Sequence, residues 1–144
     1  MKTVLKLVLA LVILTGFTAN AQKRNIAINE LPKPAQTFIS THFKGQTASY
    51  AIEDKGILST DYDVMLSGGT EIEFDSKGNW KEIDGNKSAL PNSVLPKAVA
   101  NYISKNYKDQ VVEKIEKEAG YKVEFINDLE LKFDSNGKFL RIDD

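Results

Sequence analysis

The sequence predicts an α+β fold made of two tandem units, each a helix followed by a four-stranded antiparallel meander. The two units are expected to form one curved sheet with both helices on one face. Three observations support this prediction: the halves of the chain share residues in the same order, each half has one amphipathic helical stripe, and other hydrophobic residues alternate with polar ones. The predicted boundaries are 31–84 for the first unit, 85–94 for a linker and 95–144 for the second unit.

The similarity between the two halves has two parts with different offsets. The Leu-Pro-Lys segment at 31–33 recurs at 95–97, which is an offset of 64 residues. The segment Glu-Ile-Glu-Phe-Asp-Ser at 71–76 recurs as Glu-Leu-Lys-Phe-Asp-Ser at 130–135, an offset of 59. The second copy is therefore five residues shorter, a difference that we assign to the loop at 54–59. We interpret the pattern as a tandem repeat.

Each unit is predicted to begin with a helix. Apolar side chains recur there at spacings of three to five residues, which places them on one helical stripe. Pro32 and Pro96 fall in the opening turn, where a missing N–H costs little. The stripe residues are Leu31, Ala35, Phe38, Ile39 and Phe43 in the first unit, and Leu95, Val99, Tyr102, Ile103 and Tyr107 in the second.

The hydrophobic period changes from helical to alternating after each helix. The clearest alternation is at 62–66 and 121–125, followed by 71–74 and 129–133, with weaker strands at 48–53 and 111–117. Alternation on one side only is typical of an antiparallel sheet with one covered face and one solvated face.

Two short polar segments join the last two strands of each unit. They are Asp-Ser-Lys-Gly at 75–78 and Asp-Ser-Asn-Gly at 134–137. Asp can accept hydrogen bonds from the turn amides, and Gly can adopt the positive φ that a short hairpin loop needs. A calcium loop would need several carboxylates spread over about a dozen residues, so we interpret both segments as turns.

The first 21 residues have the features of a cleaved signal peptide. Lys2 and Lys6 precede an apolar run at 7–17, and Ala-Asn-Ala at 19–21 has the small-x-small form of a cleavage site. The mature chain is expected to begin near Gln22, with 22–30 as a lead-in to the first unit. We expect a periplasmic protein with no stable membrane insertion, and secretion beyond the outer membrane stays open.

Composition excludes several classes of function. The chain has no cysteine and one histidine, which leaves no thiol nucleophile, thiolate metal site or imidazole pair. Without the two leader lysines, 17 basic and 20 acidic residues remain, a net charge of −3 that disfavours nucleic-acid binding. His42 has Asn106 as its counterpart and fits a helix cap better than a catalytic group. We therefore expect no catalytic residues, no metal, no cofactor and no enzyme.

The repeated pattern resembles a known family. A Leu-Pro helix start, followed by strands ending in Phe-Asp-x-x-Gly-x-aromatic-x-x-Ile-Asp, occurs twice behind a signal peptide, at 31–84 and 95–143. This is similar to the PepSY-like family of exported bacterial proteins, which is related in fold to the beta-lactamase inhibitor protein. The resemblance implies a helix-backed, curved sheet and a role in binding or inhibiting other proteins of the cell envelope.

Alternation also predicts which side chains lie on the open face of the sheet. With Ile83 and Ile142 inward, Lys81 and Leu140 are expected inward or at the margin. Two aromatic residues at equivalent outward positions, surrounded by charge, favour a protein-binding face. Pairing across strands, or stacking under a loop, is the alternative role for these aromatics. The predicted binding residues are Trp80, Phe139, Met65, Glu73, Glu82, Lys122, Glu124, Lys132 and Arg141.

We therefore expect a non-enzymatic exported module whose open face binds another envelope or secreted protein, with hydrolase or peptidase inhibition as one form of that role. The net charge is −4 for residues 31–84 and −1 for 95–144, which favours a basic partner for the first unit. The alternative is a sensor that holds a small ligand or peptide between the units, with Tyr50, Tyr102 and Tyr107 lining the cleft.

Overall fold

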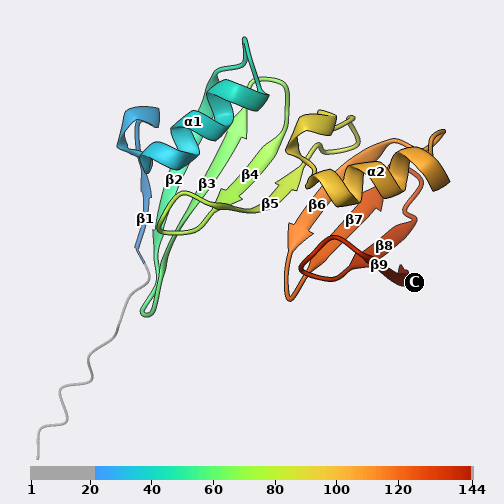
Figure 1. Ribbon diagram of the computed structural model, residues 1–144. Helices are drawn as coiled ribbons and strands as arrows, with labels where there is room; N and C mark the ends of the chain where they lie inside the picture. Colours follow the sequence, from blue (N-terminus) through green and yellow to red (C-terminus); the bar gives the residue numbers. More distant parts are fainter. Residues whose placement is uncertain (1–21, 144) are drawn as a thin grey trace, which may run out of the picture.

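The computed structural model describes residues 22–143, which form a nine-stranded antiparallel sheet whose strands follow sequence order (Figure 1). The signal peptide predicted at 1–21 lies outside the described residues. The strands are β1 (Gln22–Asn25), β2 (Ala48–Lys55), β3 (Thr60–Leu66), β4 (Glu71–Phe74), β5 (Trp80–Asp84), β6 (Val112–Lys117), β7 (Tyr121–Phe125), β8 (Glu130–Phe133) and β9 (Phe139–Asp143).

Two ten-residue helices, α1 (Lys33–His42) and α2 (Lys97–Asn106), lie against one side of this sheet (Figure 1). Each follows a single 3₁₀ turn, η1 (Ile28–Glu30) or η2 (Asn92–Val94). Within residues 22–143, neither helix has the length and apolar content needed to cross a bilayer.

The predicted fold class is wrong. We expected an α+β protein of two helix-plus-four-strand units that form one curved sheet, whereas the described chain is mostly sheet, with nine strands in sequence order and only two short helices. Direct pairing of β5 with β6 continues the ladder from one half to the other, with Ile83 opposite Ile115. A ninth strand, β1, extends the sheet at the other end of the chain.

Hydrophobic patterning does not predict β1, because its four residues are all polar or charged and all exposed. Main-chain pairing with β2 holds this edge strand, and ion pairs on both faces support it. Arg24 reaches Glu53 at 3.1 Å and Glu30 at 3.0 Å, while Lys23 lies 3.1 Å from Asp54. An edge strand needs only one hydrogen-bonded neighbour and no buried face, so hydrophobic alternation does not predict it.

One row of directly opposed residues forms the centre of the inner face, which is the face toward the helices. Residues opposite one another on adjacent antiparallel strands point to the same side of a sheet. This row is at most 3% exposed and consists of Ala51, Val64, Ile72, Ile83, Ile115, Val123 and Leu131. The predicted helical stripes pack onto it, with Ala35 and Ile39 of α1 and Val99 and Ile103 of α2 buried in the same core.

The two Asp-Ser-x-Gly segments form the predicted hairpin turns. Asp75 accepts hydrogen bonds from the backbone N–H groups of residues 77 and 79, and Asp134 from those of residues 136 and 138. Gly78 and Gly137 have φ of 84° and 80°. A Cβ at Gly78 would lie 2.8 Å from the Cβ of Pro32, so the first turn of α1 packs directly on this loop.

Candidate functional site

The face of the sheet opposite the helices, called the outer face below, is covered with charged side chains. A single row of opposed residues crosses it from β3 to β9, and we call it the charged row. Its members, in order, are Asp63, Glu73, Glu82, Glu116, Lys122, Lys132 and Arg141. Four carboxylates on four successive strands are thus followed by three basic groups on the next three strands.

Seven of the nine predicted binding residues lie on the outer face. Five belong to the charged row: Glu73, Glu82, Lys122, Lys132 and Arg141. Met65 and Glu124 belong to the adjacent row on the same face, which runs through Tyr50, Met65, Glu71, Asp84, Lys114, Glu124, Glu130 and Asp143. Their role in binding stays a prediction.

The prediction that Trp80 and Phe139 project from the outer face is wrong. Trp80 lies opposite Phe74, and Phe139 lies opposite Phe133, so both aromatics share the inner face with buried residues. The reason is a register shift in each hairpin. One extra residue is accommodated after Trp80 and another after Phe139, which reverses the alternation expected from Ile83 and Ile142.

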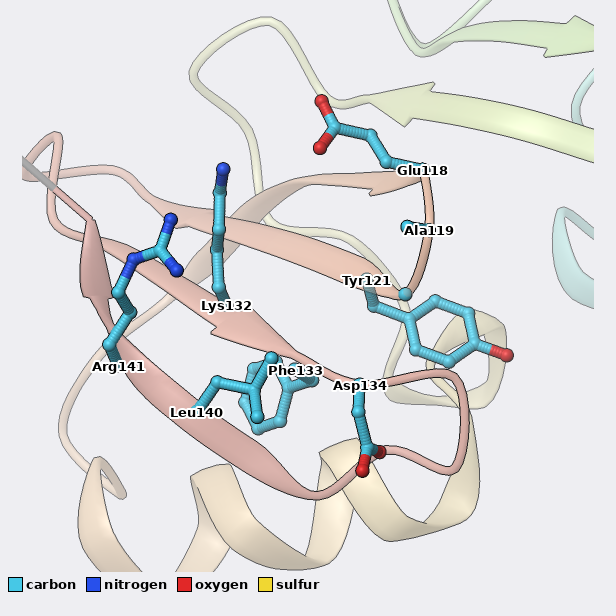
Figure 2. A pocket seen from close by; sticks show the side chains of 9 residues that line it. Glu118, Ala119, Tyr121, Lys132, Phe133, Asp134, Leu140 and Arg141 are labelled. Atoms are coloured by element: carbon cyan, nitrogen blue, oxygen red, sulfur yellow. The ribbon is translucent and has the colours of Figure 1, made fainter.

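The two extra residues are Lys81 and Leu140, and their side chains lie on the outer face or at its margin. Lys81 pairs with Asp61 at 3.1 Å and with Glu73, both outer-face carboxylates, so of the two expected placements, inward or marginal, the inward one is wrong. Leu140 is 55% exposed and lines a shallow pocket beside Lys132 and Arg141, near the β6–β7 hairpin (Figure 2). The pocket therefore lies at the margin of the outer face and is open to solvent.

Carboxylates gather on the outer face of β3 to β5, where their mutual repulsion is unfavourable. We call Asp63, Glu71, Glu73, Glu82 and Asp84 the acidic patch. Partial burial raises the pKa of Asp63, and the nearby carboxylate of Glu73 raises it further. Burial likewise raises the pKa of Glu71, with added repulsion from Asp63, Asp84 and Glu82. Like charges directly opposite one another destabilise a sheet, so this patch costs folding free energy.

Lys81 and Lys114 offset part of that cost by pairing with Asp61 and Glu82. Burial alone would lower the pKa of Lys114, but hydrogen bonds to Glu82 and Glu116 outweigh burial and raise it. The Lys114 ammonium lies 2.9 Å from an oxygen of each of these two carboxylates. In the second half the charges pair more evenly, for example Lys132 with Asp143 at 3.0 Å. The excess of carboxylates over lysines on the outer face is therefore greatest on β3 to β5.

An apolar hairpin tip lies next to the acidic patch. Ile57 and Leu58, in the loop between β2 and β3, are 77% and 98% exposed. Asp54 and Asp61 flank this tip as an opposed pair. The shorter β6–β7 loop, Glu118 to Gly120, carries no large apolar residue. The length difference was predicted in this loop, but it lies mostly in the strands, because β2 and β3 have eight and seven residues whereas β6 and β7 have six and five. The sequence analysis did not single out the two adjacent apolar side chains.

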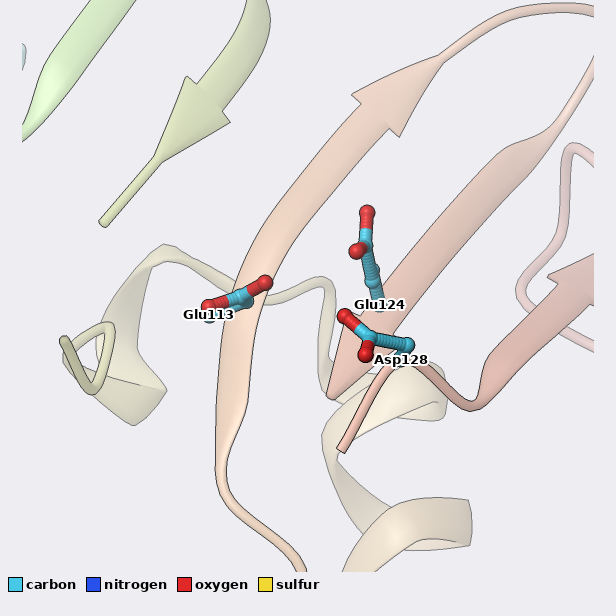
Figure 3. A group of neighbouring side chains, drawn as sticks. All are labelled: Glu113, Glu124 and Asp128. Atoms are coloured by element: carbon cyan, nitrogen blue, oxygen red, sulfur yellow. The ribbon is translucent and has the colours of Figure 1, made fainter. Parts of the chain in front are cut away.

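A second group of carboxylates lies beside Lys87, in the segment 85–94 between β5 and η2. Glu113 of β6, Glu124 of β7 and Asp128 of the following turn each contribute an oxygen, and these oxygens lie within 4.8 Å of one another (Figure 3). The Lys87 ammonium lies 2.9 Å from Glu113 Oε1 and 2.8 Å from Asp128 Oδ1. The sequence analysis missed this group, since the four residues come from three distant segments and match no metal motif.

The residues considered for chemistry or for a ligand cleft have other contacts. His42 Nδ1 lies 2.9 Å from Ser93 Oγ, so this side chain links the end of α1 to η2. Tyr102 stacks on Phe139, with ring centroids 4.7 Å apart, and is part of the core. Tyr50 lies on the outer face, remote from that core. The three tyrosines therefore do not line one cleft.

Comparison with known families decides the identity. A family model described as "Putative beta-lactamase-inhibitor-like, PepSY-like" matches residues 60–141, more than half of the chain. The chain belongs to the PepSY-like family. The matched range runs from β3 into β9 as a single segment, so it does not test the proposed tandem repeat. The comparison with curated proteins yields no match.

Solved structures of similar proteins have the same fold as this chain. A protein of Bacteroides thetaiotaomicron, described as a "putative calcium-regulated periplasmic protein", is 35% identical with a TM-score of 0.79, covering 85% of this chain and 97% of that one. A protein of Bacteroides vulgatus, described as a "putative periplasmic protein of unknown function", is 36% identical with a TM-score of 0.79, covering 85% of this chain and 100% of that one. The periplasmic descriptions support an exported location for this chain.

Proposed function

We propose that this chain is a non-enzymatic periplasmic binding module whose outer face engages another cell-envelope protein. The charged row carries this proposal. Partial burial and neighbouring carboxylates raise the pKa values of Asp63 on β3 and Glu71 on β4, so the outer face disfavours folding at these two strands. Local arrangements that reduce stability are expected at functional surfaces, where a partner compensates the cost.

The chemistry of this face favours a partner with a basic surface. Lys81 and Lys114 neutralise only part of the acidic patch, and a basic partner would supply the missing counter-charge. Complementary charge raises the rate of encounter and selects the partner more than it sets affinity. The apolar tip at Ile57 and Leu58 adds an anchor that could bury in an apolar depression on the same partner.

The finer form of the proposal is inhibition. The family description names a likeness to beta-lactamase inhibitors, and a hydrolase or peptidase of the envelope is the partner class that fits it. In this form the acidic patch would meet a basic rim and the apolar tip would enter the cleft of the target enzyme.

The test is crosslinking of the purified mature protein to a cell-envelope extract of the native organism. A Glu73→Lys, Glu82→Lys variant reverses the centre of the acidic patch and should lose the partner. An Asn101→Lys, Ser104→Lys, Asp109→Lys variant makes the same change in charge at exposed positions on and just after α2, away from the outer face, and should retain it. Equal recovery of the partner by wild type and both variants would exclude the outer face.

We also propose a second, narrower function, in which a divalent cation regulates binding. The similar protein of Bacteroides thetaiotaomicron is described as calcium-regulated, and this chain brings Glu113, Glu124 and Asp128 together. The same crosslinking experiment in calcium and in excess EGTA tests this proposal. A change in partner yield supports calcium dependence, and equal yields would contradict it.

A further inference from the structure

The side-chain group at Glu113, Glu124 and Asp128 has too little positive charge for its carboxylates. Figure 3 shows the three side chains converging from β6, from β7 and from the turn after β7. Lys87 supplies one ammonium, and Lys114, which also lines this hollow, already binds Glu82 and Glu116. Three carboxylates against one committed ammonium leave the group net negative.

Glu113 provides the second, independent observation. The residue is only 4% exposed, and its Oε1 lies 2.9 Å from the Lys87 ammonium. Among residues 22–143, no donor lies within hydrogen-bonding distance of its other oxygen, Oε2, which is fully buried. Buried polar atoms almost always have a partner, and an unsatisfied carboxylate oxygen is costly.

Lys87 has the contacts and exposure of a replaceable cation. Its side chain is 62% exposed, so it can move into solvent without opening the core. Its ammonium contacts Glu113 and Asp128 and leaves Glu124 without a direct partner.

We propose that Glu113, Glu124 and Asp128 form a site for a hard divalent cation of the Ca²⁺ type, with Lys87 as its internal competitor. Ca²⁺ takes six to eight oxygen ligands and accepts bidentate carboxylates and water. A cation bound by both oxygens of Glu113 would satisfy Oε2, which the Lys87 ammonium cannot do. The inference deepens the proposed calcium dependence by naming its site, and it requires no protein partner.

The experiment is calorimetric titration of CaCl₂ into the mature protein, with three variants. We expect one Ca²⁺ per wild-type chain. Lys87→Met should bind Ca²⁺ about tenfold more tightly, a difference of about 1.4 kcal/mol, because the variant lacks the competing ammonium. Asp128→Asn should weaken binding about tenfold by the same reasoning, and Asp128 is exposed enough for folding to be unaffected. Glu113→Gln should abolish binding.

The matched control is Asp75→Asn, which removes a carboxylate from a hairpin turn outside the site. It should leave Ca²⁺ affinity unchanged. Absence of Ca²⁺ binding by both wild type and Lys87→Met, or equal affinity in all the site variants, would overturn the site. Those results leave the outer-face proposal intact, whereas Ca²⁺ binding without any effect on crosslinking yield would contradict only the proposed regulation.

Discussion

Trp80 and Phe139 begin the last strand of their respective halves and follow the same kind of turn, but they have different neighbours. Phe139 stacks on Tyr102 of α2, with ring centroids 4.7 Å apart. Trp80 instead contacts the other half of the sheet, where Tyr121 lies at 6.4 Å and Lys117 Nζ lies 3.9 Å above its ring. Phe139 therefore packs within its own half, whereas Trp80 joins the two halves. The difference arises because β5 has β6 beside it, while β9 is an edge strand.

The outer faces of the halves differ in a complementary way. The first half gathers acidic groups and an apolar hairpin tip, whereas the second half pairs its charges across strands. The inner faces therefore supply stability in both halves, while the outer face of the first half carries the larger excess of carboxylates.

The largest expected effect tests whether the two halves share one core. Phe74 and Phe133 are equivalent inner-face residues, 0% and 2% exposed. Replacing either by Ala should destabilise the protein by about 3–5 kcal/mol, because a buried aromatic leaves a cavity. Urea denaturation followed by far-UV circular dichroism should show one transition shifted to lower urea in both variants. Two separated transitions would contradict a shared core.

A smaller effect separates the two aromatic positions. Trp80→Ala and Phe139→Ala should each cost about 2 kcal/mol, less than for a fully buried ring. Double-mutant cycles should give a coupling of about 0.5–1.5 kcal/mol for Trp80 with Tyr121 and for Phe139 with Tyr102. The cycle of Phe139 with Tyr121 is the control and should give no coupling. A zero value for Trp80 with Tyr121 would mean that Trp80 does not join the halves.

The acidic patch predicts a pH-dependent difference between wild type and Glu71→Gln. Because the folded pKa of Glu71 lies above its ordinary value of 4.5, the folded state takes up a proton at higher pH than the unfolded state. The variant should be more stable at pH 7, by about 0.5 kcal/mol or less owing to solvent screening. That advantage should shrink as pH falls through the folded pKa toward 4.5.

Urea denaturation at pH 7 and near pH 5 measures this difference. Glu118→Gln, at an exposed position outside the charged row, is the control and should show no pH-dependent gain. A Glu71→Gln variant less stable than wild type at pH 7 would show that the charge of Glu71 does not destabilise the folded state.

The smallest effect on stability is expected at the hairpin tip. Ile57→Ser with Leu58→Ser should change the free energy of unfolding by about 0.5 kcal/mol or less, because both side chains are exposed. The same variant should recover less partner in the crosslinking experiment. Unchanged recovery would remove the tip from the binding surface.

The sequence predicted the two helices, the hairpin turns and eight of the strands, because each depends on local periodicity or on residues with special backbone needs. It did not predict β1, whose polar residues pair only through the backbone and ion pairs. Nor could it place Trp80 and Phe139, since the register shifts after them depend on pairing with β4 and β8. The Glu113 group was also missed, because only folding brings Lys87 and Asp128 together.

Site-specific photo-crosslinking tests the central claim most directly. A photoreactive residue at Glu73 or Lys132 samples the outer face, and one at Ser40 or Ser104 samples the exposed side of each helix. The account predicts adducts with an envelope protein from the outer-face positions, with the higher yield at Glu73. Adducts from the helix positions alone would contradict it.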